Sequence, residues 1–160
     1  MHSTRIDLSP KTRAKVIALL NARLADAIDL QLQAKQAHWN VKGPQFIALH
    51  ELFDTLAGEL AGHADEMAER ITALGGVAEG TVQAVAGGSK LDHYPLDISD
   101  GRAHLDALAA AFARFAKSVR KAIGESGKAD DADTRDLFTG ISRGADKALW
   151  LLEAHLQADR

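Results

Sequence analysis

Histidines and carboxylates at four-residue spacing gather between residues 38 and 71. His50 and Asp54 form one pair, and Asp65 and Glu69 form a second. Residues four apart lie on the same face of a helix, and imidazole together with carboxylate suits iron, zinc and manganese. The pattern therefore predicts transition-metal binding if this stretch is helical.

The two pairs are too far apart on one helix to share a metal ion. Eleven positions separate Asp54 from Asp65, about 16 Å along a helix axis, whereas metal–ligand bonds are about 2.0–2.6 Å long. Both pairs are centred between residues 59 and 60. Two copies of the helix crossing antiparallel about a two-fold axis there would bring His50 to Glu69 of the other copy. The same crossing would bring Asp54 to Asp65, giving two equivalent sites per dimer.

Small residues occupy the centre of this symmetric pattern: Ala57, Gly58, Ala61 and Gly62. Small side chains would let two helix backbones approach closely. Glycine inside a helix costs about 1 kcal/mol relative to alanine, so two glycines here need a reason. A crossing partner helix supplies one.

His38 and its neighbour Trp39 are candidates for the same site. His38 precedes His50 by twelve residues, about 18 Å on a continuous helix. Gly43 and Pro44 interrupt the helix between them, which allows the chain to turn and bring the imidazoles together. Trp39 is either an electron donor beside the metal or an aromatic residue of the core.

The remaining candidates have simpler interpretations. His63 falls at about 220° from His50 on a helical wheel, off the stripe of the four ligands, and is expected to be structural or exposed. Glu66 and Asp29 are expected at the surface or in salt bridges. The other histidines have no ligand-like neighbours in the sequence: His2, His93, His104 and His155.

Four long helices must position these residues. Helical periodicity and caps predict a first helix over about 10–39 and a second over about 45–74. The third is expected from a cap at Ser99 or Asp100 to about residue 123, and the fourth begins at 131–133. The connection 75–98 is long, with a possible short helix at 81–86. This order is typical of an all-α, ferritin-like four-helix bundle with a crossover, although another all-helical domain remains an alternative. Residues 1–8 are expected to be a short tail and 9–158 one domain.

Composition excludes several classes of function. The chain has 160 residues and no cysteine, which rules out disulfides, zinc–thiolate sites and iron–sulfur clusters. Neither a signal peptide nor a membrane span is present in the sequence pattern, so a cytoplasmic location is expected. The formal net charge of −3 argues against strong nucleic-acid binding by the body of the protein.

The run from His38 to Asp54, HWNVKGPQFIALHELFD, resembles the signature of the Dps family (DNA-binding proteins from starved cells). Asp65, Glu69, Arg70 and Ile71 continue it at the family's spacing. Segments 136–139 and 146–153 are also similar to the family, so the resemblance covers nearly the whole chain. Classical ferritin is disfavoured, because its Glu-x-x-His pairs are missing and Glu59 is followed by His63 one residue too far along.

The resemblance implies a hollow homododecamer with ferroxidase centres at its two-fold interfaces. Each centre would hold two iron ions between His38, His50 and Asp54 of one subunit and Asp65 and Glu69 of its neighbour. It implies oxidation of ferrous iron, preferably by hydrogen peroxide, and storage of the ferric product, which would protect the cell and its DNA. Zinc is a possible competitor for the ligands. A structural cage without catalysis is an alternative, but all five ligand positions match.

An acidic cluster stands near the start of the last helix: Asp130, Asp131, Asp133 and Asp136. Acids at a helix N-terminus are favoured by the helix dipole, which is explanation enough for some of them. By resemblance, Asp133 and Asp136 would line a three-fold pore that draws cations inward.

DNA binding is expected to be weak or absent at neutral pH. Family members that bind DNA strongly carry a lysine-rich tail, whereas residues 1–8 hold Arg5 alone and residues 158–160 add no basic tail. Lys11, Arg13 and Lys15 lie on the predicted first helix and could add weak avidity. The alternative function is a nucleoid-associated DNA-binding protein with a secondary iron site.

Overall fold

The computed structural model describes residues 1–157 and contains five helices and no strand in that range. They are α1 (Pro10–Asn40), α2 (Phe46–Ala73), α3 (Val82–Gly88), α4 (Gly101–Gly127) and α5 (Ala132–Ala154). The predicted all-α fold class is confirmed. Residue 158, the predicted end of the domain, and the C-terminal residues 159 and 160 lie outside the described range.

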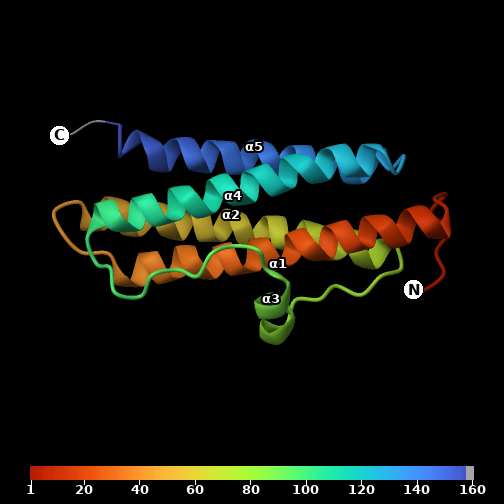
Figure 1. Cartoon of the computed structure of the whole chain (residues 1–160), viewed down its shortest axis with the longest axis horizontal. Coiled ribbons are helices and arrows are strands. Elements are labelled where there is room, and N and C mark those ends of the chain that lie inside the picture. The colour runs from red at the N-terminus through yellow and green to blue at the C-terminus, as the bar shows by residue number, and fades with distance from the viewer. Residues whose placement is uncertain (158–160) are drawn as a thin grey trace.

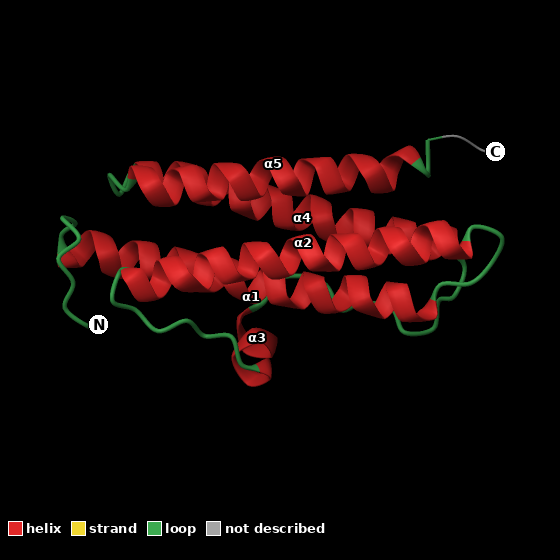
Figure 2. Cartoon of the chain, turned by 180° about the vertical axis from the view of Figure 1, so that it is seen from behind, coloured by secondary structure: helices red, strands yellow, loops and turns green. Residues whose placement is uncertain are grey.

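Two antiparallel helix pairs make the bundle, α1 with α2 and α4 with α5 (Figure 1). The segment between α2 and α4 returns along the length of the bundle and carries α3 on the outer side of α1 (Figures 1 and 2). Because of this return, α2 and α4 run in the same direction. The predicted crossover with a short extra helix is therefore present, and the extra helix covers residues 82–88.

Side chains at the predicted caps begin the helices. Ser9 accepts a hydrogen bond from the Thr12 amide at 3.1 Å, and Asp100 accepts one from the Ala103 amide at 3.0 Å. The predicted end of α4 at residue 123 is wrong, because the helix continues to Gly127. Gly124 stays helical, and the turn follows at residues 128–130, where Asp130 has a φ of +60°.

The core lies between the two pairs and is filled mainly by leucine, alanine and four fully buried phenylalanines: Phe53, Phe112, Phe115 and Phe138. Neither tryptophan belongs to it. Trp39 and Trp150 are 63% and 60% exposed, so the interpretation of Trp39 as a core aromatic is wrong for the single chain. None of the described helices combines the length and apolar character needed to cross a membrane.

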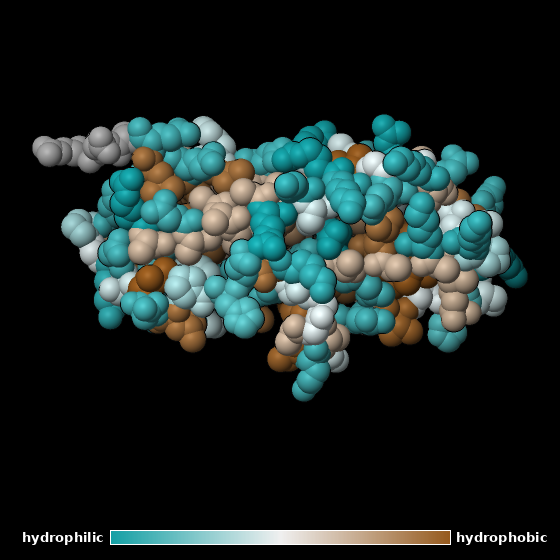
Figure 3. Space-filling model, viewed as in Figure 1, coloured by the Kyte–Doolittle hydropathy of each residue, from teal (hydrophilic) through white to brown (hydrophobic). Residues whose placement is uncertain are grey.

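Apolar side chains are also exposed on the side of the molecule that carries α3. Leu32 of α1, Val82 of α3 and Leu96 of the crossover are 51%, 75% and 78% exposed. Figure 3 shows apolar residues on the protruding α3 and along the crossover. An apolar surface of this kind commonly marks a contact with another chain.

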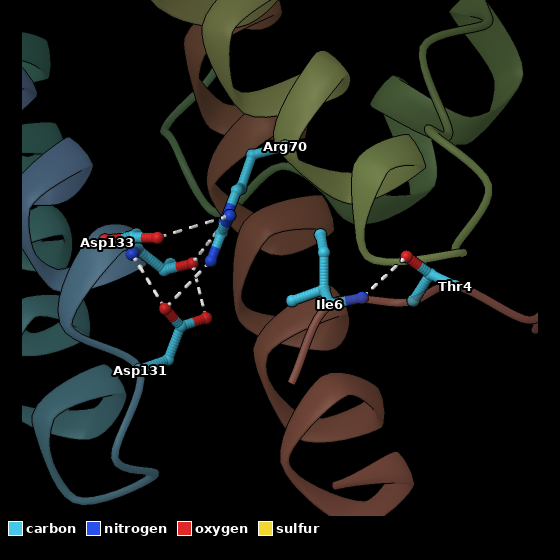
Figure 4. A network of polar contacts seen from close by, with 6 residues as sticks. Thr4, Ile6, Arg70, Asp131 and Asp133 are labelled. Atoms are coloured by element: carbon cyan, nitrogen blue, oxygen red, sulfur yellow. Dashed lines mark hydrogen bonds and ion pairs between the residues drawn. The ribbon is translucent and has the colours of Figure 1, made fainter. Parts of the chain in front are cut away.

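The N-terminal tail is tied to the bundle rather than free. The His2 amide donates to the Gly75 carbonyl at 2.7 Å, and Thr4 accepts from the Ile6 amide at 3.2 Å (Figure 4). The Arg13 guanidinium donates to the carbonyls of His2 and Leu74. Arg13 is only 8% exposed, so the expectation that it adds to a surface for DNA is wrong.

Candidate metal centre

His38 and His50 form a mutual pair at one end of the bundle. Nδ1 of His38 lies 2.7 Å from the His50 carbonyl oxygen, and Nδ1 of His50 lies 2.8 Å from the His38 carbonyl oxygen. The rings stack with centroids 3.7 Å apart and planes inclined by 20°. A carbonyl only accepts, so each Nδ1 carries a proton. In the neutral rings both Nε2 atoms are therefore left with a lone pair that can bind a metal ion.

The turn between α1 and α2 creates this pair. His38 is in the last turn of α1 and His50 in the first turns of α2. Gly43 adopts a φ of +114°, a backbone conformation that residues with a side chain rarely adopt. The Lys42 amide donates to the Ser99 carbonyl at 2.8 Å. The structure thus brings the two histidines together in the way that the Gly-Pro interruption predicts.

Asp54 stands one turn beyond His50, with its side chain 56% exposed. Nζ of Lys35 lies 2.6 Å from Asp54 Oδ1, and this hydrogen bond lowers the pKa of Asp54 below its usual value. The same ammonium lies 5.6 Å from the centroid of the Trp39 ring. The carboxylate is therefore ionised at neutral pH and already attracts a cation.

Asp65 and Glu69 are exposed farther along α2, away from the histidine pair. Within residues 1–157, no three histidines or carboxylates of one chain are grouped so that they could hold a metal ion. The structure brings together His38 and His50 with Asp54 nearby, and it does not bring Asp65 and Glu69 to them. The five predicted ligands therefore do not converge within one chain over the described residues.

The exposed face of α2 between the two carboxylate groups has room for a partner helix. Gly58 and Gly62 are exposed, and a Cβ atom at either position would meet no atom within 4 Å. Ala61 is half-buried, but Ala57 is 3% exposed and packs in the core. The expectation that Ala57 contributes to the crossing surface is therefore wrong.

The acidic cluster divides into a structural and an exposed part. Asp131 is 2% exposed; it caps α5 through the Thr134 amide and accepts from Arg70 at 2.9 Å (Figure 4). Asp133 is 86% exposed and 3.9 Å from Arg70, and Asp136 is also exposed. Asp133 and Asp136 are thus at the surface, whereas Asp131 holds α5 to α2.

Residues away from the ligands hold the crossover in ways that the sequence did not show. Asp29, expected at the surface or in a salt bridge, is half-buried and accepts from Gln33 and from the Ser89 hydroxyl. His104, which has no ligand-like neighbours in the sequence, is 1% exposed and pairs with Tyr94. The apolar period around Leu105 and Leu108 indicates a buried face for this histidine, but nothing local indicates its partner.

His63 is half-buried, its ring close to Gly144 of α5, and its Nδ1 lies 3.6 Å from Glu66. Glu66 itself is exposed. Neither residue approaches the histidine pair, in agreement with the interpretation that both lie outside the metal site.

Comparison with known proteins places the chain in a family. A family model described as "Ferritin-like domain" matches residues 17–160. A "DNA protection during starvation protein" of Agrobacterium fabrum is 51% identical over 98% of this chain and 96% of that protein. The solved Dps of Mycobacterium smegmatis has a TM-score of 0.94 and 35% identity, covering 99% of this chain and 96% of that one.

The Dps protein of Vibrio cholerae, described as a member of a broad superfamily of ferritin-like diiron-carboxylate proteins, has a TM-score of 0.90 and 26% identity. It covers 98% of both chains. With this fold, the histidine pair and these relatives in view, the chain belongs to the Dps family of ferritin-like proteins.

Proposed function

We propose that this protein is a ferroxidase and iron-storage subunit whose metal centre is shared between two chains. His38, His50 and Asp54 would bind ferrous iron together with Asp65 and Glu69 of the partner subunit. The observation that carries the proposal is the histidine pair, because both Nδ1 protons are directed to main-chain carbonyls. This fixes the two Nε2 atoms as ligands before any metal arrives.

The ligand set suits the oxidation of two ferrous ions as substrates. Each ion gives up one electron, and one hydrogen peroxide molecule takes both electrons and two protons to form two water molecules. Since the electrons are taken in a pair, no hydroxyl radical is released. The anionic oxygens of Asp54, Asp65 and Glu69 favour the ferric product as hard donors, and the imidazoles hold the ferrous substrate.

The shared site requires the two α2 helices to cross near residues 58–62. The open space above Gly58 and Gly62 supports such a crossing, and so do the apolar side chains exposed around α3. The relationship to Dps proteins supports a homododecamer in which Asp133 and Asp136 of three subunits line a pore. Tripling each exposed carboxylate would focus a field that attracts cations.

Protection of DNA would follow from the removal of iron and peroxide rather than from tight DNA binding. The relatives are called DNA protection proteins, but residues 1–8 of this chain hold one fixed cation, Arg5, and the tail is bonded to Gly75. Affinity for DNA at physiological salt needs several phosphate contacts. A cytoplasmic protein with weak association to the nucleoid fits these features best.

The experiment that tests the shared site is complementation between two inactive variants. Protein carrying His50→Ala and Asp54→Ala is co-expressed with protein carrying Asp65→Ala and Glu69→Ala. The mixed assemblies are loaded anaerobically with ferrous iron, and ferric absorbance is followed after peroxide or oxygen is added. Zinc added before the iron measures competition for the ligands.

In a random assembly, the subunit that supplies the histidine side of a site is intact there with a probability of one half. The subunit that supplies Asp65 and Glu69 is independently intact there with the same probability. About a quarter of the wild-type sites are therefore restored if the ligands come from two symmetric subunits. Each variant alone should oxidise no faster than iron in buffer. Mixed assemblies that stay inactive, while the wild type is active, would show that each chain builds its own site.

A further inference from the structure

Tyr94 and His104 form a hydrogen-bonded pair outside the proposed ligands, in which His104 is buried and Tyr94 is half-buried. Tyr94, in the crossover, is the single tyrosine of the chain, and its hydroxyl lies 2.7 Å from Nδ1 of His104 on α4. The two rings are nearly parallel, with planes inclined by 14°. His104 is 1% exposed, and its Nε2 has no hydrogen-bond partner among the described residues.

His104 lies near residues that adjoin the proposed ligands in the sequence. The ring of His104 is 6.4 Å from that of Phe53, centroid to centroid. Phe53 precedes Asp54 and is three residues from His50, so it occupies a neighbouring position on α2. On the other side, the carbonyl of Asn40, two residues after His38, lies close enough to act on His104. Residues of both helices that carry the proposed histidine ligands therefore lie near this imidazole.

The protonation states make the pair a donor and an acceptor. Burial lowers the pKa of His104 below its usual value. The Asp100 carboxylate and the Asn40 main chain act in the opposite direction, but burial is the larger effect. Burial also raises the pKa of Tyr94. At neutral pH the imidazole is therefore uncharged and the phenol is protonated, so the Tyr94 hydroxyl donates to His104 Nδ1. A phenol loses an electron readily only if its proton has an acceptor, and Nδ1 of His104 is an acceptor already in hydrogen-bond contact.

We propose that Tyr94 is an electron donor to the metal centre when the centre holds a single ferrous ion, and that His104 accepts the phenol proton. This inference rests on the proposed ferroxidase function. Peroxide needs two electrons; the ferrous ion gives one and Tyr94 gives the other. With two protons from solvent the products are one ferric ion, two water molecules, a neutral tyrosyl radical and protonated His104.

Electron paramagnetic resonance of freeze-quenched samples tests this step. Wild-type protein is loaded with one ferrous ion per site, mixed with peroxide and frozen, and in parallel it is loaded with two. We expect a tyrosyl radical at one ion per site and little at two. Because the chain has one tyrosine, ring-deuterated tyrosine must narrow the signal, and this needs no substitution that could disturb folding.

Variants separate the donor from the proton acceptor. Tyr94→Phe keeps the ring and removes the hydroxyl, so it should lose the tyrosyl signal and release more hydroxyl radical at one ion per site, with unchanged oxidation at two. His104→Gln should lower the radical yield. Trp150→Phe, an exposed aromatic substitution on α5, is the control and should keep the signal.

The two proposals fail in different ways. If the fully loaded wild type oxidises iron rapidly but shows no tyrosyl signal at one ion per site, the role of Tyr94 is refuted and the ferroxidase stands. If the fully loaded wild type does not oxidise iron, the ferroxidase itself is refuted. A full tyrosyl signal in His104→Gln would refute proton transfer to His104.

Discussion

The two exposed glycines of α2 give opposite expectations for one subunit and for the assembly. In the single chain, a side chain at Gly58 or Gly62 meets no atom within 4 Å. Glycine in a helix is about 1 kcal/mol less favourable than alanine and glutamine lies between the two, so Gly58→Gln with Gly62→Gln should stabilise the folded subunit by about 1 kcal/mol. In the proposed assembly, the same side chains would occupy the space through which a second α2 passes.

We therefore expect the double glutamine variant to fold and to lose both subunit pairing and rapid oxidation of iron. Sedimentation velocity measures the assembly, and ferric absorbance after peroxide measures the reaction. Stability is compared by denaturation at a protein concentration low enough for both proteins to be monomeric. The matched control is Gly124→Gln, because Gly124 is another exposed glycine of a long helix with no atom within 4 Å of a Cβ.

The result that would refute the reasoning is simple. If the double variant assembles and oxidises iron like the wild type, α2 does not cross a second copy at these glycines. The five ligands must then be brought together in another way. A variant that fails to gain stability as a monomer would instead show that the single-chain environment of these glycines is not open.

Three further predictions concern other parts of the molecule. Lys35→Met removes the ammonium that lowers the pKa of Asp54, so carbon NMR should show the Asp54 carboxyl titrating at higher pH. Anaerobic titration should show tighter binding of ferrous iron. An unchanged Asp54 titration would contradict this. The pair of Lys35 and Asp54 stabilises the fold while the Asp54 carboxyl is ionised. Its contribution is therefore lost as the pH falls through the lowered pKa of Asp54. Arg70→Met leaves Asp131 buried without its cation and should cost about 3–5 kcal/mol in chemical denaturation, whereas a cost below about 0.5 kcal/mol would mean that the pair is unimportant. In a gel shift at physiological salt, DNA binding should be weak or absent because residues 1–8 offer one fixed cation; nanomolar affinity would overturn that expectation.

Local chemistry made the helices and the histidine pair predictable. Ser9 and Asp100 cap helices through bonds to residues only three positions away, so their roles can be read from a short window of sequence. A short turn joins the helices that carry His38 and His50, and the glycine and proline within it predict that turn. The end of α4 was misplaced because Gly124 signals a stop that the surrounding packing overrides.

Contacts between distant segments could not be predicted in this way. Lys35 reaches Asp54 across nineteen positions, and Arg70 reaches Asp131 across sixty-one. These pairings depend on how α1, α2 and α5 pack against one another. The partner of His104 was missed for the same reason, because Tyr94 arrives on a crossover with no periodic pattern.

The mutual bonds of the histidine pair also join the metal centre to the end of a helix. The last carbonyls of a helix lack intrahelical partners, and the Lys42 amide, which could have bonded to the His38 carbonyl, bonds to Ser99 instead. The imidazole of His50 fills that role and so acts as a cap for α1. The bond requires Nδ1 to carry the proton, so the tautomer that caps the helix is the one that leaves Nε2 with a lone pair. Closing the turn between α1 and α2 therefore also sets the tautomer of the histidine pair.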